Sequence, residues 1–185
     1  MTNTSVPAGV QNEYVVNNLE NTGSMLKNNA ESGMMFPEGN DSAYRKSADP
    51  LRDAMGSIKD SHPEEMERIT RKAQTEGVEI IQDGRGMAYA PGLTSGVPGQ
   101  LHLSPDDSYG AWLHEEKHMD DDKRDGYPGF KGMVDRKRRI QMEKDAYQKE
   151  IDLALSIGRE DIAKRLQENM EDEIGRILEG GEETL

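Results

Sequence analysis

The sequence predicts an α+β domain in which a short, largely antiparallel sheet packs against a central helix and two C-terminal helices. Three observations lead to this fold class. Short β-branched or alternating segments occur only within residues 78–103, apolar residues recur at helical spacing from residue 104 onward, and residues 1–60 show neither period. We therefore expect a domain over residues 61–185 that follows a flexible arm over residues 1–60.

The N-terminal arm differs from the rest of the chain in composition. Eight of the nine asparagines lie within the first forty residues, where Lys27 is the only basic side chain. A segment with so few periodic apolar residues cannot bury enough surface to offset the entropy of ordering the chain. Residues 1–60 are accordingly predicted to be largely disordered.

The domain is predicted to begin with one helix. Ser61 can cap its first turn, Pro63 suits the first helical position, and Gly77 ends it. The two glutamates after Pro63 favour the positive end of the helix dipole.

Three short strands are expected next. Residues 78–81 are mostly β-branched, and the turn at 83–86 would return the chain as a second strand over residues 87–90. Residues 100–103 alternate polar and apolar side chains, which is typical of a strand with one solvated face.

The C-terminal half is predicted to be helical. A helix-start cluster at 104–107 precedes a helix over residues 109–119, and a loop rich in glycine follows it. The two last helices are separated by Gly158 and carry apolar stripes at helical spacing. These stripes are Ile140, Tyr147, Ile151 and Leu155 in one helix, and Ile162, Leu166, Met170, Ile174 and Leu178 in the other.

Composition limits the partners of the chain. With 23 basic and 36 acidic residues the formal net charge is −13, so phosphate backbones would repel the protein and a nucleic-acid partner is not expected. Without cysteine, only His, Asp and Glu remain as strong metal ligands. No apolar run approaches the roughly 18 residues of a bilayer span, and the first residues lack the basic and apolar regions of a Sec-type signal peptide.

The most informative motif is His114-Glu115-Glu116-Lys117-His118, which has the H-E-x-x-H spacing. On a helix the two imidazoles project from one face and can bind one cation. Glu115 lies next to them, where it can reach a water on that cation and act as the catalytic base, and the ligand types favour Zn²⁺. The alternative interpretation is a polar, solvated helix with two incidental histidines.

A catalytic zinc site usually needs a third protein ligand. Glu143 lies on the apolar stripe of the next helix, where a bare carboxylate would be costly, so it is the predicted ligand. Glu150, seven residues later on the same face, is the reserve ligand, whereas Asp145 points to the opposite face. Alternatively, Glu143 turns outward or pairs with one of the arginines at 138–139.

Two further residues are candidates for supporting functions. Asp122 follows His118 by one helical turn and is expected to orient a ligand or cap the helix rather than bind the metal. Tyr127, in the glycine-rich loop, could point its phenol at a developing oxyanion, although a loop tyrosine more often packs against its neighbours.

The segments GVPGQLHLSPDDSYGAWLHEEKHMDDD and EKDAYQKEIDLALSIG resemble the zincin-like metallopeptidase domains of bacterial polymorphic toxins and injected effectors. The resemblance covers roughly residues 77–178 and is strongest at the H-E-x-x-H motif. It implies a compact zinc-peptidase fold with His114 and His118 as ligands, Glu115 as general base and Glu143 as a gluzincin-type third ligand.

The resulting hypothesis is a zinc endopeptidase that acts as a bacterial toxin or effector on a protein of a target cell. It would be made in the bacterial cytoplasm without a Sec signal and then secreted or injected. Its arm would serve delivery or packaging, and an immunity protein or a delivery apparatus would be further partners. The alternatives are a non-catalytic acidic phage or secretion-system protein with a structural or degenerate metal site, and a hydrolase of a non-peptide amide.

Overall fold

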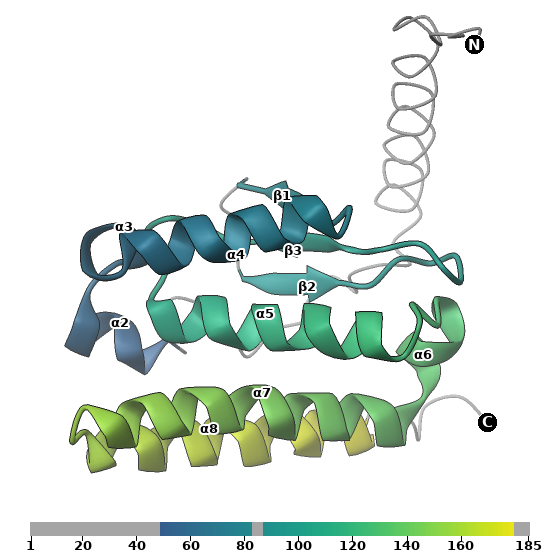
Figure 1. Ribbon diagram of the computed structural model, residues 1–185. Coiled ribbons are helices and arrows are strands. Elements are labelled where there is room, and N and C mark those ends of the chain that lie inside the picture. The colour runs from purple at the N-terminus through teal and green to yellow at the C-terminus, as the bar shows by residue number, and fades with distance from the viewer. Residues whose placement is uncertain (1–48, 83–86, 180–185) are drawn as a thin grey trace, which may run out of the picture. The chain divides into compact units, whose positions relative to one another are not determined.

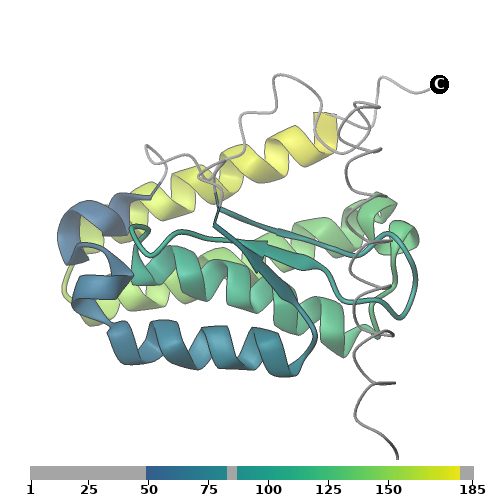
Figure 2. The same ribbon diagram turned by 90° about the horizontal axis from the view of Figure 1, so that it is seen from above.

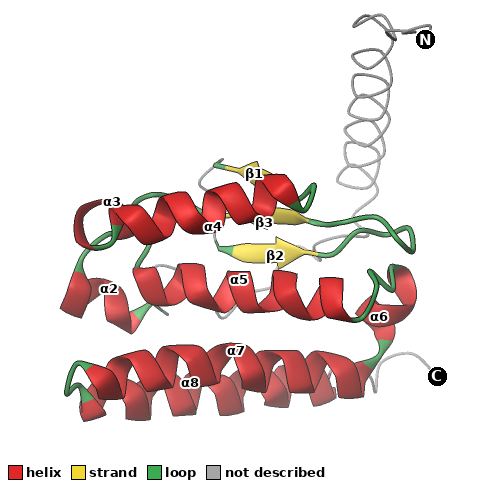
Figure 3. Ribbon diagram, viewed as in Figure 1, coloured by secondary structure: helices red, strands yellow, loops and turns green. Residues whose placement is uncertain are grey.

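The computed structural model describes residues 49–82 and 87–179, which all belong to one compact unit (Figure 1). The described fold is mixed α+β, as predicted, and combines its helices with one small three-stranded sheet (Figure 3). In chain order the elements are α2 (Pro50–Met55), α3 (Ile58–Ser61), α4 (Pro63–Thr75), β1 (Glu79–Ile81), β2 (Ala88–Ala90), β3 (Gln100–His102), α5 (Tyr109–Arg124), α6 (Phe130–Val134), α7 (Arg136–Ser156) and α8 (Glu160–Glu179).

The long helices begin and end at residues that favour helix termini. Ser108 caps α5 by accepting a hydrogen bond from the Ala111 N–H, and Asp135 caps α7 by accepting one from the Arg138 N–H. Gly158 adopts φ 73° between α7 and α8, a conformation that glycine reaches without strain. The short helix α6 lies in the segment that was expected to be a loop.

The sheet has the order β1-β3-β2 (Figure 2). Strand β3 pairs in parallel with β1 and antiparallel with β2, so the expected hairpin between residues 78–81 and 87–90 and the largely antiparallel sheet are wrong. The central place suits β3, because Leu101 is fully buried and both edges of its backbone are paired. The predicted turn at 83–86 lies outside the described residues.

Helix α5 lies at the centre of the fold. Figure 1 shows it between the layer of α4 and the sheet on one side and the antiparallel pair α7 and α8 on the other. Its Trp112 and Met119 are buried in the core together with Leu101 from β3 and Tyr147 from α7. Side chains of α5 can therefore meet groups from both layers.

The N-terminal boundary of the domain lies before residue 60. Leu51 and Ile58 are fully buried, and the Asp49 carboxylate accepts hydrogen bonds from the Ser108 N–H and hydroxyl at 2.9 and 2.6 Å. Leu51 packs so closely on Gly110 that a Cβ there would lie 2.2 Å from Leu51 Cδ1. The predicted boundary at residue 60 is therefore wrong for α2 and α3, and the expectation for residues 1–48 falls outside the described residues.

The sequence predicts no membrane-spanning segment. Among residues 49–82 and 87–179, no helix is long and apolar enough to cross a membrane.

Candidate metal centre

Helix α5 presents the H-E-x-x-H motif to the interior. His114 and His118 are 1% and 8% exposed, so the alternative of a solvated helix with incidental histidines is wrong. The charged residue Glu116 is accommodated on another side of α5, where its carboxylate accepts two hydrogen bonds of 2.7 Å from Arg68 and one of 2.9 Å from Lys72. The helix is thus buried without leaving this charge unpaired.

Three donor groups converge from α5 and α7. The Nε2 atoms of His114 and His118 are 3.0 Å apart, and each lies 3.5 Å from an oxygen of Glu143. In a tetrahedral zinc site with ligand bonds of 2.0–2.1 Å, donor atoms lie roughly 3.3–3.4 Å apart. His114, His118 and Glu143, the three residues predicted as ligands, therefore form a group that could hold a metal ion.

Glu150 lies on the other side of His114 and is not part of this group. Its Oε1 is 2.6 Å from Nδ1 of His114, while Nε2 of the same ring faces the other donors. A metal-binding histidine commonly has its second nitrogen held by a carboxylate. The structure thus corrects the interpretation of Glu150 as a reserve ligand, because the intervening imidazole ring separates it from the donor group.

Electrostatics distinguish the two imidazoles. Burial lowers the pKa of His114 to about 4. Burial acts in the same direction on His118, but the negative charge of Glu143 outweighs it and raises the pKa of His118 to about 9. Burial alone would raise the pKa of Glu143, yet the charge of His118 and hydrogen bonds from both histidines hold it well below its ordinary value.

Glu115 lies beside the donor group, and its position is fixed by the sheet. Its side chain is buried, and Oε2 accepts a hydrogen bond of 2.6 Å from the backbone N–H of Tyr89 in β2. Burial raises the pKa of Glu115 to about 7. A carboxylate with that pKa can both accept and release a proton near neutral pH.

A second network supports β2. The Tyr89 hydroxyl accepts a hydrogen bond from the Gly99 N–H and donates one of 2.9 Å to Asp122, whose other oxygen accepts one of 2.9 Å from Arg138. Asp122 is buried and lies outside the donor group, in a supporting position. Arg138 pairs with Asp122 and Asp125, which excludes the alternative in which this arginine neutralises Glu143.

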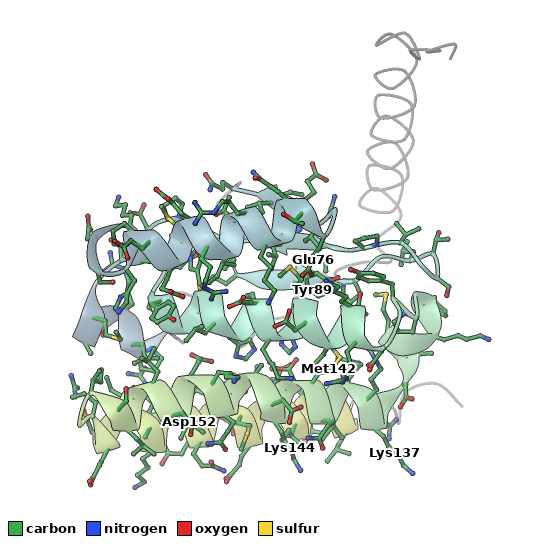
Figure 4. The ribbon with its side chains drawn as sticks, viewed as in Figure 1. Glu76, Tyr89, Lys137, Met142, Lys144 and Asp152 are labelled. Atoms are coloured by element: carbon green, nitrogen blue, oxygen red, sulfur yellow. The ribbon has the colours of Figure 1, made fainter. Side chains whose placement is uncertain are left out.

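The donor group and Glu115 open onto one cavity of about 360 Å³. Figure 4 places Tyr89 and Met142 on the two sides of α5 that border it. The cavity is lined by Met87, Ala88, Tyr89, Pro91, His114, Glu115, His118, Gly132, Met133, Arg138, Arg139, Met142, Glu143 and Glu173.

Tyr127 does not line this cavity. It has φ 53°, its N–H donates to the Asp122 carbonyl, and its own carbonyl accepts from the Gly96 N–H. These backbone hydrogen bonds join it to α5 and to the loop that precedes β3, and the structure gives no support to the expected oxyanion role. Tyr89, which sequence reasoning missed, lies at the cavity instead; the only local signal was an aromatic residue between two alanines in a predicted strand.

Comparison of the chain with protein-family models, with curated proteins and with solved structures found no match.

Proposed function

We propose that the protein is a zinc-dependent endopeptidase. The observation that carries this proposal is the convergence of His114, His118 and Glu143 at 3.0–3.5 Å on a cavity that Glu115 also lines. Two histidines, one carboxylate and an open side are the ligand pattern of catalytic rather than closed structural zinc sites.

The chain supplies the other groups that peptide hydrolysis requires. Zinc, when bound, acts as a Lewis acid that activates water and polarises a carbonyl. Glu115 accepts the proton of the attacking water and delivers it to the amine as the C–N bond breaks. Because Oε2 of Glu115 is held by the Tyr89 N–H, we assign the proton transfer to Oε1.

Glu150 and Tyr89 orient these groups rather than react. Glu150 fixes the ring of His114 through Nδ1, so that Nε2 faces His118 and Glu143, where the three residues would hold the cation. Tyr89 sets the distance between β2 and α5 because it is bonded at its backbone to Glu115 and at its hydroxyl to Asp122.

The biological setting follows from the sequence resemblance alone. We infer a bacterial toxin or effector that is secreted or injected and cleaves a protein in a target cell, with an immunity protein or delivery apparatus as a further partner. The same resemblance, to metallopeptidases, makes a polypeptide the proposed substrate.

The test compares the parent protein with Glu115→Gln, His114→Ala and the exposed control Glu168→Gln. Zinc content is measured by elemental analysis, cleavage with a fluorogenic peptide library, and toxicity by expression in susceptible cells. Glu115→Gln should keep its zinc and lose roughly 10²–10⁴-fold in cleavage, His114→Ala should lose both, and Glu168→Gln neither. A zinc-loaded Glu115→Gln protein with parental cleavage and toxicity would refute the mechanism and favour a structural metal site.

A further inference from the structure

A run of four basic residues, Arg136-Lys137-Arg138-Arg139, forms the first turn of α7, and Lys131 lies just before it on α6. Positive charge at this end of a helix opposes the macrodipole, and the first turn of α7 contains no acidic residue. Sequences that break a local rule of this kind commonly do so at functional sites.

Most arginines of the described domain contact a carboxylate. Arg68, Arg124 and Arg159 do so at 2.5–2.8 Å, and Arg138 is held by Asp122 and Asp125. By contrast, no ion pair links Arg136 or Arg139 to any residue of 49–82 or 87–179. Arg139 lies near Glu173 and Glu143, which line the same cavity, but neither carboxylate is within ion-pair distance of it.

These charges border the candidate metal centre. Arg139 lines the cavity together with His114, His118 and Glu143, and Gly132 and Met133 of α6 line it as well. Arg136, Lys137 and Lys131 are exposed on the neighbouring surface, and Figure 4 shows Lys137 projecting outward from α7. A chain that leaves the cavity beside Arg139 would reach the first turn of α7, which carries Arg136 and Lys137, and α6, which carries Lys131. We refer to Lys131, Arg136, Lys137 and Arg139 as the basic rim.

We propose that the basic rim binds an acidic stretch of the polypeptide substrate next to the bond that is cleaved. The substrate class is thus a protein with several Asp or Glu residues on one side of the scissile bond. Arg139 would contact a carboxylate at the cavity, while Lys131, Arg136 and Lys137 would contact acids further along the substrate chain. An acidic peptide is favoured over nucleic acid or an anionic membrane, because a net charge of −13 repels large polyanions whereas a short peptide meets only the local positive charge.

The experiment separates binding from catalysis, since the inference rests on the proposed peptidase function. Zinc-loaded Glu115→Gln protein is titrated with two fluorescein-labelled decapeptides of the same apolar core, one carrying four Glu residues on one side and the other four Gln. Binding is followed by fluorescence anisotropy at low and at 0.5 M salt. Peptide binding does not require Glu115 to be a base, so it can fail or succeed whether or not the cleavage assay supports a peptidase.

The test variant is a triple variant that combines Arg136→Gln, Lys137→Gln and Arg139→Gln. The control is the single variant Lys144→Gln. Lys144 is exposed on the same helix, two turns after Lys137, and also projects outward (Figure 4). The acidic peptide should bind the parent at least tenfold more tightly than the Gln peptide at low salt, and the preference should vanish in the triple variant and at high salt but persist in Lys144→Gln.

Equal affinity for both peptides in the parent protein would overturn the proposal. So would stronger binding of a labelled single-stranded DNA or of vesicles with anionic lipid than of the acidic peptide.

Discussion

The backbone N–H of Tyr89 donates a hydrogen bond of 2.6 Å to Oε2 of Glu115, which ties strand β2 to the candidate catalytic carboxylate on α5. The hydroxyl of the same tyrosine is anchored on Asp122, two turns along α5 from Glu115. Tyr89 therefore joins β2 to α5 at two points. The position of Glu115 depends on this strand as well as on its own helix.

Tyr89→Phe should lower kcat about tenfold and leave KM nearly unchanged, because the strand that holds Glu115 loses its anchor. Loss of a buried hydrogen bond should also reduce the free energy of unfolding by about 1–2 kcal/mol. Tyr127→Phe is the matched control, since Tyr127 does not line the cavity, and it should leave kcat unchanged. Steady-state cleavage of a fluorogenic peptide and urea denaturation measure the two effects. A larger loss in Tyr127→Phe than in Tyr89→Phe would contradict this assignment.

Glu143→Ala should sharply reduce zinc retention, because it removes one of the three converging donors. Asp145→Ala, two residues away on α7, should keep the parental zinc content, since Asp145 contacts Lys117 and Gln141 instead. Zinc is measured by elemental analysis after dialysis and by competition with a chromophoric chelator. If Glu143→Ala bound zinc as tightly as the parent protein, the third ligand would have to be another acidic residue.

Glu150→Ala should weaken zinc binding by roughly 10–100-fold without abolishing it, as is usual when the carboxylate behind a ligating histidine is removed. Glu150→Gln should lie closer to the parent, because the amide oxygen can still accept a hydrogen bond from Nδ1 of His114. The same chelator competition gives both affinities. If Glu150→Ala retained no zinc at all, as expected of Glu143→Ala, Glu150 would be a ligand after all.

Arg68→Ala should destabilise the protein by about 1–3 kcal/mol, because it removes two charge-assisted hydrogen bonds from the buried carboxylate of Glu116. The loss stays below that of a fully buried pair, because Arg68 is 42% exposed and Glu116 keeps Lys72 as a partner. Burial alone would raise the pKa of Glu116, but the hydrogen bonds and charges of Arg68 and Lys72 outweigh it and lower that pKa. The stabilisation is therefore present above the ordinary glutamate pKa and is lost as the pH falls through the lowered pKa of the folded state.

Denaturant unfolding of the parent, Arg68→Ala, Glu116→Gln and the double variant at pH 7 and pH 4 measures this pair. The control is Arg71→Ala, whose partner Glu67 is exposed, and it should change stability by less than about 0.5 kcal/mol. A loss in Arg68→Ala no larger than that of Arg71→Ala would show that the pair contributes little.

The long helices and the grouping of His114, His118 and Glu143 were predictable from the sequence because both follow from local patterns. The four-residue spacing of His114 and His118 fixes a common helix face, and the place of Glu143 on an apolar stripe implies that its charge is compensated. The role of Glu150 was not predictable in this way. Glu143 and Glu150 share one helix face, and only the relative position of α5 and α7 decides which carboxylate meets Nε2 and which meets Nδ1 of His114.

The pairing of the strands and the hydrogen bond from Tyr89 to Glu115 also could not be predicted from the sequence. The turn residues at 83–86 favoured a hairpin between the two strands that flank them. In the structure β3, which carries the fully buried Leu101, lies between those two strands instead. The contact that Tyr89 makes with Glu115 comes from its backbone, which carries no residue-specific signal. Likewise, the short helices α2 and α3 are too brief to show a period, although they fill part of the core.

Leu51→Ala should lower the free energy of unfolding by about 2–5 kcal/mol, the usual cost of such a truncation in a core. Leu51 is fully buried, and its side chain contacts the backbone of α5 at Gly110, so a smaller residue leaves a cavity that the rigid helix cannot fill. Asp53→Ala is the control, because Asp53 is exposed on the same helix, and it should change stability by less than about 0.5 kcal/mol. Both are measured by urea unfolding of the full chain with zinc present and with zinc removed. The same loss in both states would place α2 in the core that supports α5 whether or not the metal is bound. An unchanged unfolding midpoint in Leu51→Ala would instead show that α2 does not contribute to the stability of the core. The domain would then begin at residue 61, as the sequence predicts.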